Sequence, residues 1–209
     1  MIRRPPRSTQ SRSSAASDVY KRQNKTIILL AGVSSIFLAC SNNDDLPEVI
    51  NEEELITTVS ATLIPQNGGE TILLKSIDLD GGDGPNAPVI SVSGNLTSDT
   101  NYAVTLEILN ETEDPAENIT LEILEEDEAH QFFYSFTNSL ATTTYKDQDA
   151  NGNPVGVVFD LVTGTAATGS FNITLKHEPN KEAANVSSGD ITNASGETDV
   201  QVTFNLTVN

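Results

Sequence analysis

The segment 199–208 constrains the fold more than any other part of the chain. Every second residue in it is apolar: Val200, Val202, Phe204, Leu206 and Val208. A period of two places these side chains together on one face of a β-strand. A helix would scatter the same residues around its circumference. The segment is therefore predicted to be a strand with one buried side.

Similar alternation, or a short β-branched run, recurs from residue 55 onward. Gly, Asn, Asp and Pro punctuate the gaps, as is typical of turns. Many short strands separated by turns indicate an antiparallel sandwich or barrel. We predict an all-β fold, an antiparallel β-sandwich of immunoglobulin-like or similar type, with about eight or nine strands. The predicted strands are 58–64, 71–78, 89–92, 102–109, 131–136, 156–162, 170–176 and 199–208.

The acidic segment 116–128 fits either a helix or a strand. Ile119, Ile123 and Leu124 have helical spacing, and Glu-rich segments that contain Leu and Ile favour helices. As a strand, the segment would instead turn Ile119, Leu121 and Ile123 inward. The sequence favours a short helix here, and the strand stays open as the alternative.

The N-terminal part of the chain differs in composition from the rest. Residues 1–23 are basic and Ser-rich without apolar periodicity, and they resemble a translated sequencing-adaptor artefact. Lys25 and the apolar run 27–38 follow. This arrangement is typical of a secretion signal, and the run is short for a bilayer core of about 30 Å. The signal peptide is predicted over 24–39 and ends at the chain's single cysteine, Cys40.

Cys40 stands where the bacterial lipobox places its lipidated cysteine. Ala39 precedes it, as the pattern requires, whereas Phe37 replaces the usual Leu at the third position before the cysteine. From this resemblance we predict that Cys40 is lipidated. Multiple acyl chains would anchor the protein stably to a membrane. Residues 40–54 are polar and acidic. They are predicted to form a flexible linker, because such a composition cannot offset the entropy lost on ordering.

Residues 55–209 are predicted to form a single domain. The whole chain holds 30 acidic and 11 basic residues, with a formal net charge of -19. This charge repels a phosphate backbone and excludes nucleic-acid binding through a basic surface. A single cysteine excludes an intramolecular disulfide and a multi-cysteine zinc site. The chain has no G-x-S-x-G, P-loop, HExxH or GxGxxG motif, so we predict that it is not an enzyme.

A shift of 69 residues aligns two parts of this domain without a gap. It places Asp78 and Asp80 on Asp147 and Asp149. Each copy then contains a strand, an acidic loop, a strand, a turn and a strand. A duplication would predict pseudo-two-fold symmetry, with the acidic loops in equivalent places. The alternative to duplication is that strands and loops alternate in this way in any β-sandwich.

The second acidic loop resembles the start of a calcium-binding loop. Asp147, Asp149 and Asn151, followed by Gly152, fit the pattern D-x-D-x-N-G. Ca²⁺ takes about six to eight oxygen ligands, which a loop of alternate carboxylates can supply. However, Val158 stands where an EF-hand has its bidentate Glu. Asn-Gly between alternating segments is also a hairpin signal that needs no metal.

The first acidic loop is a similar candidate, with Asp78, Asp80 and Asp83 as its ligands. It carries one extra residue before Asp83, and Asp is common in turns without a metal. Ca²⁺ is the one cofactor that the sequence suggests, and turn chemistry is the alternative at both loops.

The histidines and aromatics give weaker signals. His130 and His177 lie near acidic residues, but their spacing does not require a metal. We interpret them as loop or strand-end residues, with metal binding as the minor alternative. The aromatic run in 131–136 is predicted to be core, because the chain has no Trp, and a sugar-stacking platform is the alternative.

A further resemblance rests on segments spread over 40–209: Cys40 with its acidic tail, 51–58, 78–88, 130–134, 177–181, 188–193 and 196–199. Together they resemble small secreted lipoproteins of marine Bacteroidota, flavobacteria especially. The resemblance implies secretion and a lipid anchor, but no functional residues. Some similar sequences carry the label "type 1 periplasmic binding fold", which implies a two-lobed α/β fold. The absence of βαβ alternation in this sequence contradicts such a fold.

These features predict a lipid-anchored cell-envelope lipoprotein that acts as a non-catalytic binding or adhesion-type module. Acidic residues soon after Cys40 resemble the surface-export signal of Bacteroidota lipoproteins, which favours the outer-membrane cell surface over the periplasmic face. The expected partners are the membrane, through the lipid, and a protein, glycan or small-molecule ligand, but no nucleic acid. A solute-capture lipoprotein is the alternative, which a concave pocket would favour. A hydrolase is the weakest candidate and needs a cleft with two facing carboxylates.

Overall fold

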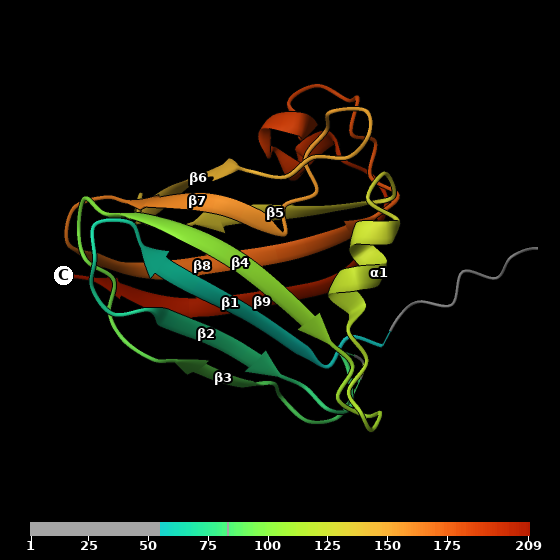
Figure 1. Cartoon of the computed structure of the whole chain (residues 1–209), viewed down its shortest axis with the longest axis horizontal. Coiled ribbons are helices and arrows are strands. Elements are labelled where there is room, and N and C mark those ends of the chain that lie inside the picture. The colour runs from blue at the N-terminus through green and yellow to red at the C-terminus, as the bar shows by residue number, and fades with distance from the viewer. Residues whose placement is uncertain (1–54, 83) are drawn as a thin grey trace, which may run out of the picture. The chain divides into compact units, whose positions relative to one another are not determined.

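The computed structural model describes residues 55–82 and 84–209. The chain divides into two units, 1–48 and 49–209, and the described residues belong to the second. Within them, nine strands form two antiparallel sheets with one α-helix, which confirms the all-β sandwich (Figure 1). Cys40, the signal peptide, the linker and Asp83 lie outside the described residues. None of the described helices is long and apolar enough to cross a membrane.

One sheet has six strands and the other has three. The larger sheet contains β1 (Thr58–Pro65), β2 (Ile72–Ile77), β3 (Val89–Val92), β4 (Asn101–Leu109), β6 (Ala141–Tyr145) and β7 (Val158–Thr163). The smaller sheet contains β5 (His130–Phe136), β8 (Ala167–His177) and β9 (Glu197–Val208). The strand orders are β3-β2-β1-β4-β7-β6 and β5-β8-β9. This arrangement differs from the immunoglobulin constant domain, in which strands A, B, E and D face C, F and G.

The core lies between the two sheets and follows the alternation of the sequence. In β9, Val202, Phe204, Leu206 and Val208 are buried, as their period of two predicts. Phe132, Tyr134 and Phe136 of β5 join the same core, and Phe136 stacks on Phe171 of β8 with ring centroids 4.5 Å apart. Phe133 is buried in a second, smaller cluster with Val186 and Ala194. The prediction that these aromatics are core residues is confirmed.

The acidic segment does form a short helix, α1 (Ile119–Glu125). Ile119 and Ile123 are buried, whereas Leu121 is 58% exposed. A strand would have buried all three residues on one face, so the helical spacing decides between the alternatives. The Thr120 hydroxyl accepts a hydrogen bond from the backbone N–H of Ile108 at 2.7 Å, which fixes α1 beside the end of β4.

Strand β6 (Ala141–Tyr145) is the one strand in the described part of the chain that no sequence pattern predicted. Its three central residues are all Thr, so apolar alternation is missing. The strand forms the edge of the six-stranded sheet, where one side needs no strand partner. Thr is β-branched and favours extended backbone, and this propensity was the available signal.

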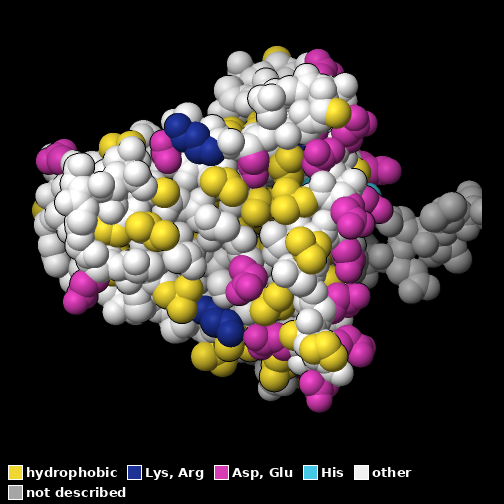
Figure 2. Space-filling view, viewed as in Figure 1, with side chains coloured by type: hydrophobic (Ala, Val, Ile, Leu, Met, Phe, Trp, Pro, Cys, Tyr) yellow, Lys and Arg dark blue, Asp and Glu magenta, His cyan; other side chains and the backbone are white. Residues whose placement is uncertain are grey.

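The acidic loops and the longest connections share one end of the sandwich. The pairing of β1 with β2 and β4 places loop 78–88 beside the end of β4. Loop 146–157 reaches the same end, where the Val157 carbonyl accepts from the backbone N–H of Leu106. Helix α1 and the connection 178–196 lie there too, opposite the C-terminus (Figure 1). We call this the loop end, and acidic side chains gather along it in Figure 2.

The 69-residue repeat is divided between the two sheets. Its copies form the hairpins β2–β3 and β6–β7, which both belong to the larger sheet. Their third strands separate, because β4 stays in that sheet and β8 joins the smaller one. The expected pseudo-two-fold relation therefore does not extend to the third strands.

Candidate functional site

A cavity of about 680 Å³ lies at the loop end, between the edges of the two sheets. Strand β3 forms an edge of the larger sheet, β9 forms an edge of the smaller one, and the two strands lie near each other. The walls come from residues 55–59, from the β2–β3 hairpin and from 198–203 of β9. The volume is within the roughly 300–1,000 Å³ that is common for small-molecule sites.

The cavity combines apolar walls with carboxylates. Ile56, Val59 and other aliphatic side chains form part of the lining, while Asp78, Asp80 and Asp199 contribute acidic groups. Among the described residues, no Lys or Arg lines it. A negative potential is focused inside such a concave, partly apolar space. The cavity therefore suits a ligand with a positive charge and a hydrophobic part.

Asp80 is held in place by Asn86. Its Oδ2 accepts hydrogen bonds from the Asn86 backbone N–H at 3.1 Å and from the Asn86 side-chain amide at 2.8 Å. These bonds stabilise the ionised carboxylate, and the Asn86 backbone bond is the main reason that the pKa of Asp80 is lowered. Asp80 therefore presents a fixed negative charge to the cavity.

Asp78 has the opposite character. Its Oδ1 atom is buried and has no hydrogen-bond partner within the described part of the chain. Burial is the main cause that raises the pKa of Asp78, and the neighbouring Asp80 carboxylate adds to it. Two neighbouring carboxylates with unequal pKa values would both be stabilised by a cationic group placed between them. A cationic ligand in the cavity would therefore stabilise the ionised form of Asp78.

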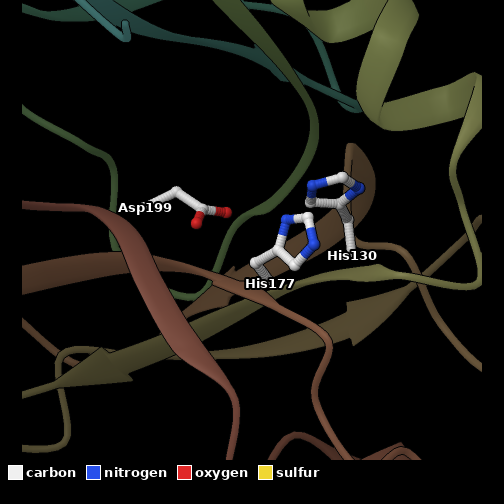
Figure 3. Close-up of side chains that lie close together, drawn as sticks. All are labelled: His130, His177 and Asp199. Atoms are coloured by element: carbon white, nitrogen blue, oxygen red, sulfur yellow. The ribbon is translucent and has the colours of Figure 1, made fainter. Parts of the chain in front are cut away.

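A second group of ligating side chains adjoins this cavity. His130, His177 and Asp199 each offer a metal-binding atom, and these atoms lie within 4.8 Å of one another. His130 begins β5 and pairs directly with His177 at the end of β8. Their rings meet edge-to-face with centroids 4.7 Å apart. Figure 3 shows the three side chains converging from neighbouring strands. We call them the His–Asp cluster.

A β-bulge brings Asp199 into the His–Asp cluster. Leu175 of β8 pairs with Val200, whereas the next residue pairs with Thr198, so Asp199 is the extra residue of β9. Bulges of this kind re-aim a side chain and are common beside functional sites. Gly196 has φ +66°, and a side chain there would collide with the carbonyl oxygen of His177. Glycine therefore allows β9 to begin close against β8.

His130 is oriented by the backbone. Its side chain is buried, and Nδ1 lies 3.1 Å from the carbonyl oxygen of Glu126. A carbonyl oxygen can only accept, so Nδ1 carries the proton, and Nε2 of the neutral ring keeps its lone pair. Burial also lowers the pKa of His130, which favours the neutral ring.

The predicted calcium ligands of the second acidic loop have other partners. Asp147 accepts the backbone N–H groups of Gly156 at 2.7 Å and Val158 at 2.8 Å, one on each carboxylate oxygen. Asp149 Oδ1 accepts the backbone N–H groups of Asn151 and Asn153, both at 2.9 Å. The Asp149 bonds are the contacts of a turn, whereas the Asp147 bonds join the two ends of the loop.

The other oxygen of Asp149 forms a buried ion pair. Oδ2 lies 3.0 Å from Nζ of Lys181, with the two side chains 1% and 5% exposed. Burial alone would raise the pKa of Asp149, but the bonds from Lys181 and the loop amides outweigh it, and the pKa is lowered. Lys181 also donates to the Asp127 carbonyl, so it joins three segments of the loop end. A Ca²⁺ ion here would have to displace Lys181, and calcium binding at this loop stays a prediction.

The sequence named part of this site and missed the rest. Asp78 and Asp80 were candidates, and the structure places both in the cavity wall. His130 and His177 were candidates too, with metal binding as the minor alternative. Asp199 and the convergence of the three side chains were missed, because the three residues lie far apart in the chain.

Comparison of the chain with family models, with curated proteins and with solved structures found no match.

Proposed function

We propose that this protein is a lipid-anchored binding module of the cell envelope that captures a small, positively charged ligand in the cavity at the loop end. The observation that carries the proposal is an acidic cavity of about 680 Å³. A concave site supports solute capture over adhesion through a flat surface. The proposed anchor at Cys40 rests on the signal peptide and its final cysteine, and the proposed outer-membrane surface location rests on the acidic residues that follow Cys40.

Charge and apolar area have separate roles in this proposal. Asp78, Asp80 and Asp199 attract a cation, and the net charge of -19 steers it toward the protein. The aliphatic walls, which include Val59 and Val202, remove the hydrophobic part of the ligand from water. An anion of the same shape meets the same walls but is repelled by the carboxylates.

Calorimetric titration with three six-carbon probes separates these roles. Hexylammonium, hexanol and hexanoate share the alkyl chain and differ in charge. We expect hexylammonium to bind the full chain carrying Cys40→Ser, hexanol to bind more weakly, and hexanoate to give no signal. Equal binding of hexanoate and hexylammonium would overturn the proposal.

Two variants with the same change of charge test the location. Asp78→Asn alters the cavity, whereas Asp99→Asn alters an exposed residue at the opposite end. Asp99 has φ +49°, which Asn tolerates well. We expect Asp78→Asn to weaken hexylammonium binding and Asp99→Asn to leave it unchanged. An equal effect of both variants would show non-specific attraction to an acidic protein.

The anchor is tested in cells with a clickable palmitate analogue. We expect labelling of the full chain and its loss in Cys40→Ser. Cleavage by protease added to intact cells then distinguishes the outer surface from the periplasmic face.

A further inference from the structure

We propose that His130, His177 and Asp199 form a binding site for a divalent first-row transition metal of the Zn²⁺ class. The three side chains supply two imidazole nitrogens and one carboxylate oxygen. Imidazole suits Zn²⁺, Co²⁺ and Ni²⁺, whereas Ca²⁺ and Mg²⁺ take oxygen ligands. The inference goes beyond the proposed function, because it does not depend on which ligand the cavity binds.

The geometry is close to what a metal requires. The three candidate atoms lie within 4.8 Å of one another. Ligands at about 2.0–2.2 Å from one Zn²⁺ ion are separated by roughly 3.4 Å in a tetrahedral site. Small side-chain rotations therefore close the remaining gap, without movement of the strands.

The backbone holds the cluster in position before any metal arrives. The bond from His130 Nδ1–H to the Glu126 carbonyl is the outer contact that orients a ligating histidine and leaves Nε2 as the donor. The N–H of Glu178 donates to the Ala129 carbonyl at 2.6 Å, which ties the ends of β5 and β8 together next to the two histidines. The bulge at Asp199 completes the row.

The His–Asp cluster meets the cavity at Asp199. Three protein ligands leave at least one coordination position for water or another donor. Asp199 belongs to the cavity wall as well as to the His–Asp cluster, so the metal would lie at that wall. A purely structural zinc site would instead have four protein ligands.

Co²⁺ titration followed by visible absorption tests this inference. The full chain is used with Cys40→Ser, because the free thiol is a competing metal ligand. We expect tetrahedral Co²⁺ bands that saturate at about one equivalent and are displaced by Zn²⁺. Loss of a residue that only contacts a metal ligand weakens metal binding by about 10–100-fold. His177→Gln removes a ligand itself, so it should weaken Co²⁺ binding by more than about 100-fold. Asp199→Asn should weaken it, and the charge-matched control Asp99→Asn should have no effect.

Proton NMR of the Co²⁺ form covers the case in which a variant fails to fold. The chain contains two histidines, so their ring signals are readily assigned. We expect both rings to show large paramagnetic shifts, including an exchangeable proton from His130 Nδ1. Absence of Co²⁺ binding, unshifted histidine signals with Co²⁺ bound, or unchanged affinity in folded His177→Gln would each overturn the inference.

Discussion

The two acidic loops begin with the same Asp-x-Asp spacing but have opposite environments. In the second loop, Asp147 binds backbone amides through both oxygens, and Asp149 is buried against Lys181. In the first loop, Asp78 lines the cavity and has a buried oxygen without a hydrogen-bond partner among the described residues. The difference teaches that the partner of a carboxylate, rather than the motif that contains it, decides whether it holds the fold or remains available to a ligand.

Lys181 is the physical cause of this difference. It comes from the connection 178–196 and enters the second loop, where it contacts Asp149 and the carbonyl of Asp127. Among the described residues, the cavity beside the first loop is lined by no lysine. The second acidic loop thus binds the ammonium group of Lys181, whereas the carboxylates of the first loop remain available to a cation from solution.

The largest expected effect is the loss of this internal cation. Lys181→Ala leaves Asp149 buried and unpaired, which should cost about 3–5 kcal/mol of the free energy of unfolding. The melting midpoint should fall by roughly 6–20 °C. Asp78→Asn removes a carboxylate that is not paired with a lysine, and it should change the midpoint by only about 1–2 °C. Thermal unfolding of both variants checks the contrast, and a small loss in Lys181→Ala would contradict it.

The pH dependence of stability should also separate the loops. The pKa of Asp149 is lowered, so its ionised carboxylate stabilises the fold at pH values above the pKa of an ordinary Asp. This stabilisation is lost as the pH falls below about 4 and through the pKa of the folded state. The pKa of Asp78 is raised, so its ionisation lowers stability as the pH rises above about 4. Relative to the wild type, Asp149→Asn should be least destabilised in acid, and Asp78→Asn should gain stability toward neutral pH. Melting curves from pH 3 to pH 7 measure both differences, and parallel curves would remove the distinction.

The smallest expected effect is that of calcium. Millimolar Ca²⁺ and Mg²⁺ should raise the melting midpoint equally over EDTA, because both screen the negative charge. A specific site filled to about 100 times its dissociation constant would add about 2.7 kcal/mol, or several degrees. A Ca²⁺-specific rise that is lost in Asp147→Ala but kept in Asp78→Asn would show that the second acidic loop binds calcium.

Local pattern was sufficient for most of the fold. The period of two in β9 and the spacing of Ile119 and Ile123 in α1 are visible in the sequence, because burial on one face leaves a periodic trace. Strand β6 was missed because an edge strand of threonines leaves no such trace.

The candidate site was less accessible to prediction. His130 and His177 meet only because β5 pairs with β8, and strand pairing between distant segments has no local signal. Asp199 reaches them through a bulge that follows from the β8–β9 register. The Asp-x-Asp spacing identified Asp78 and Asp149 equally, whereas their roles depend on where Lys181 is placed.

Amide chemical-shift mapping during a hexylammonium titration tests the contrast between the loops most directly. We expect the largest shifts at 78–82 and 198–203, which line or adjoin the cavity, and little change at 147–153, where Lys181 already neutralises Asp149. Shifts that are largest at 147–153, or spread evenly over the acidic surface, would contradict the account. It holds that the first acidic loop is available to a ligand and that the second is not.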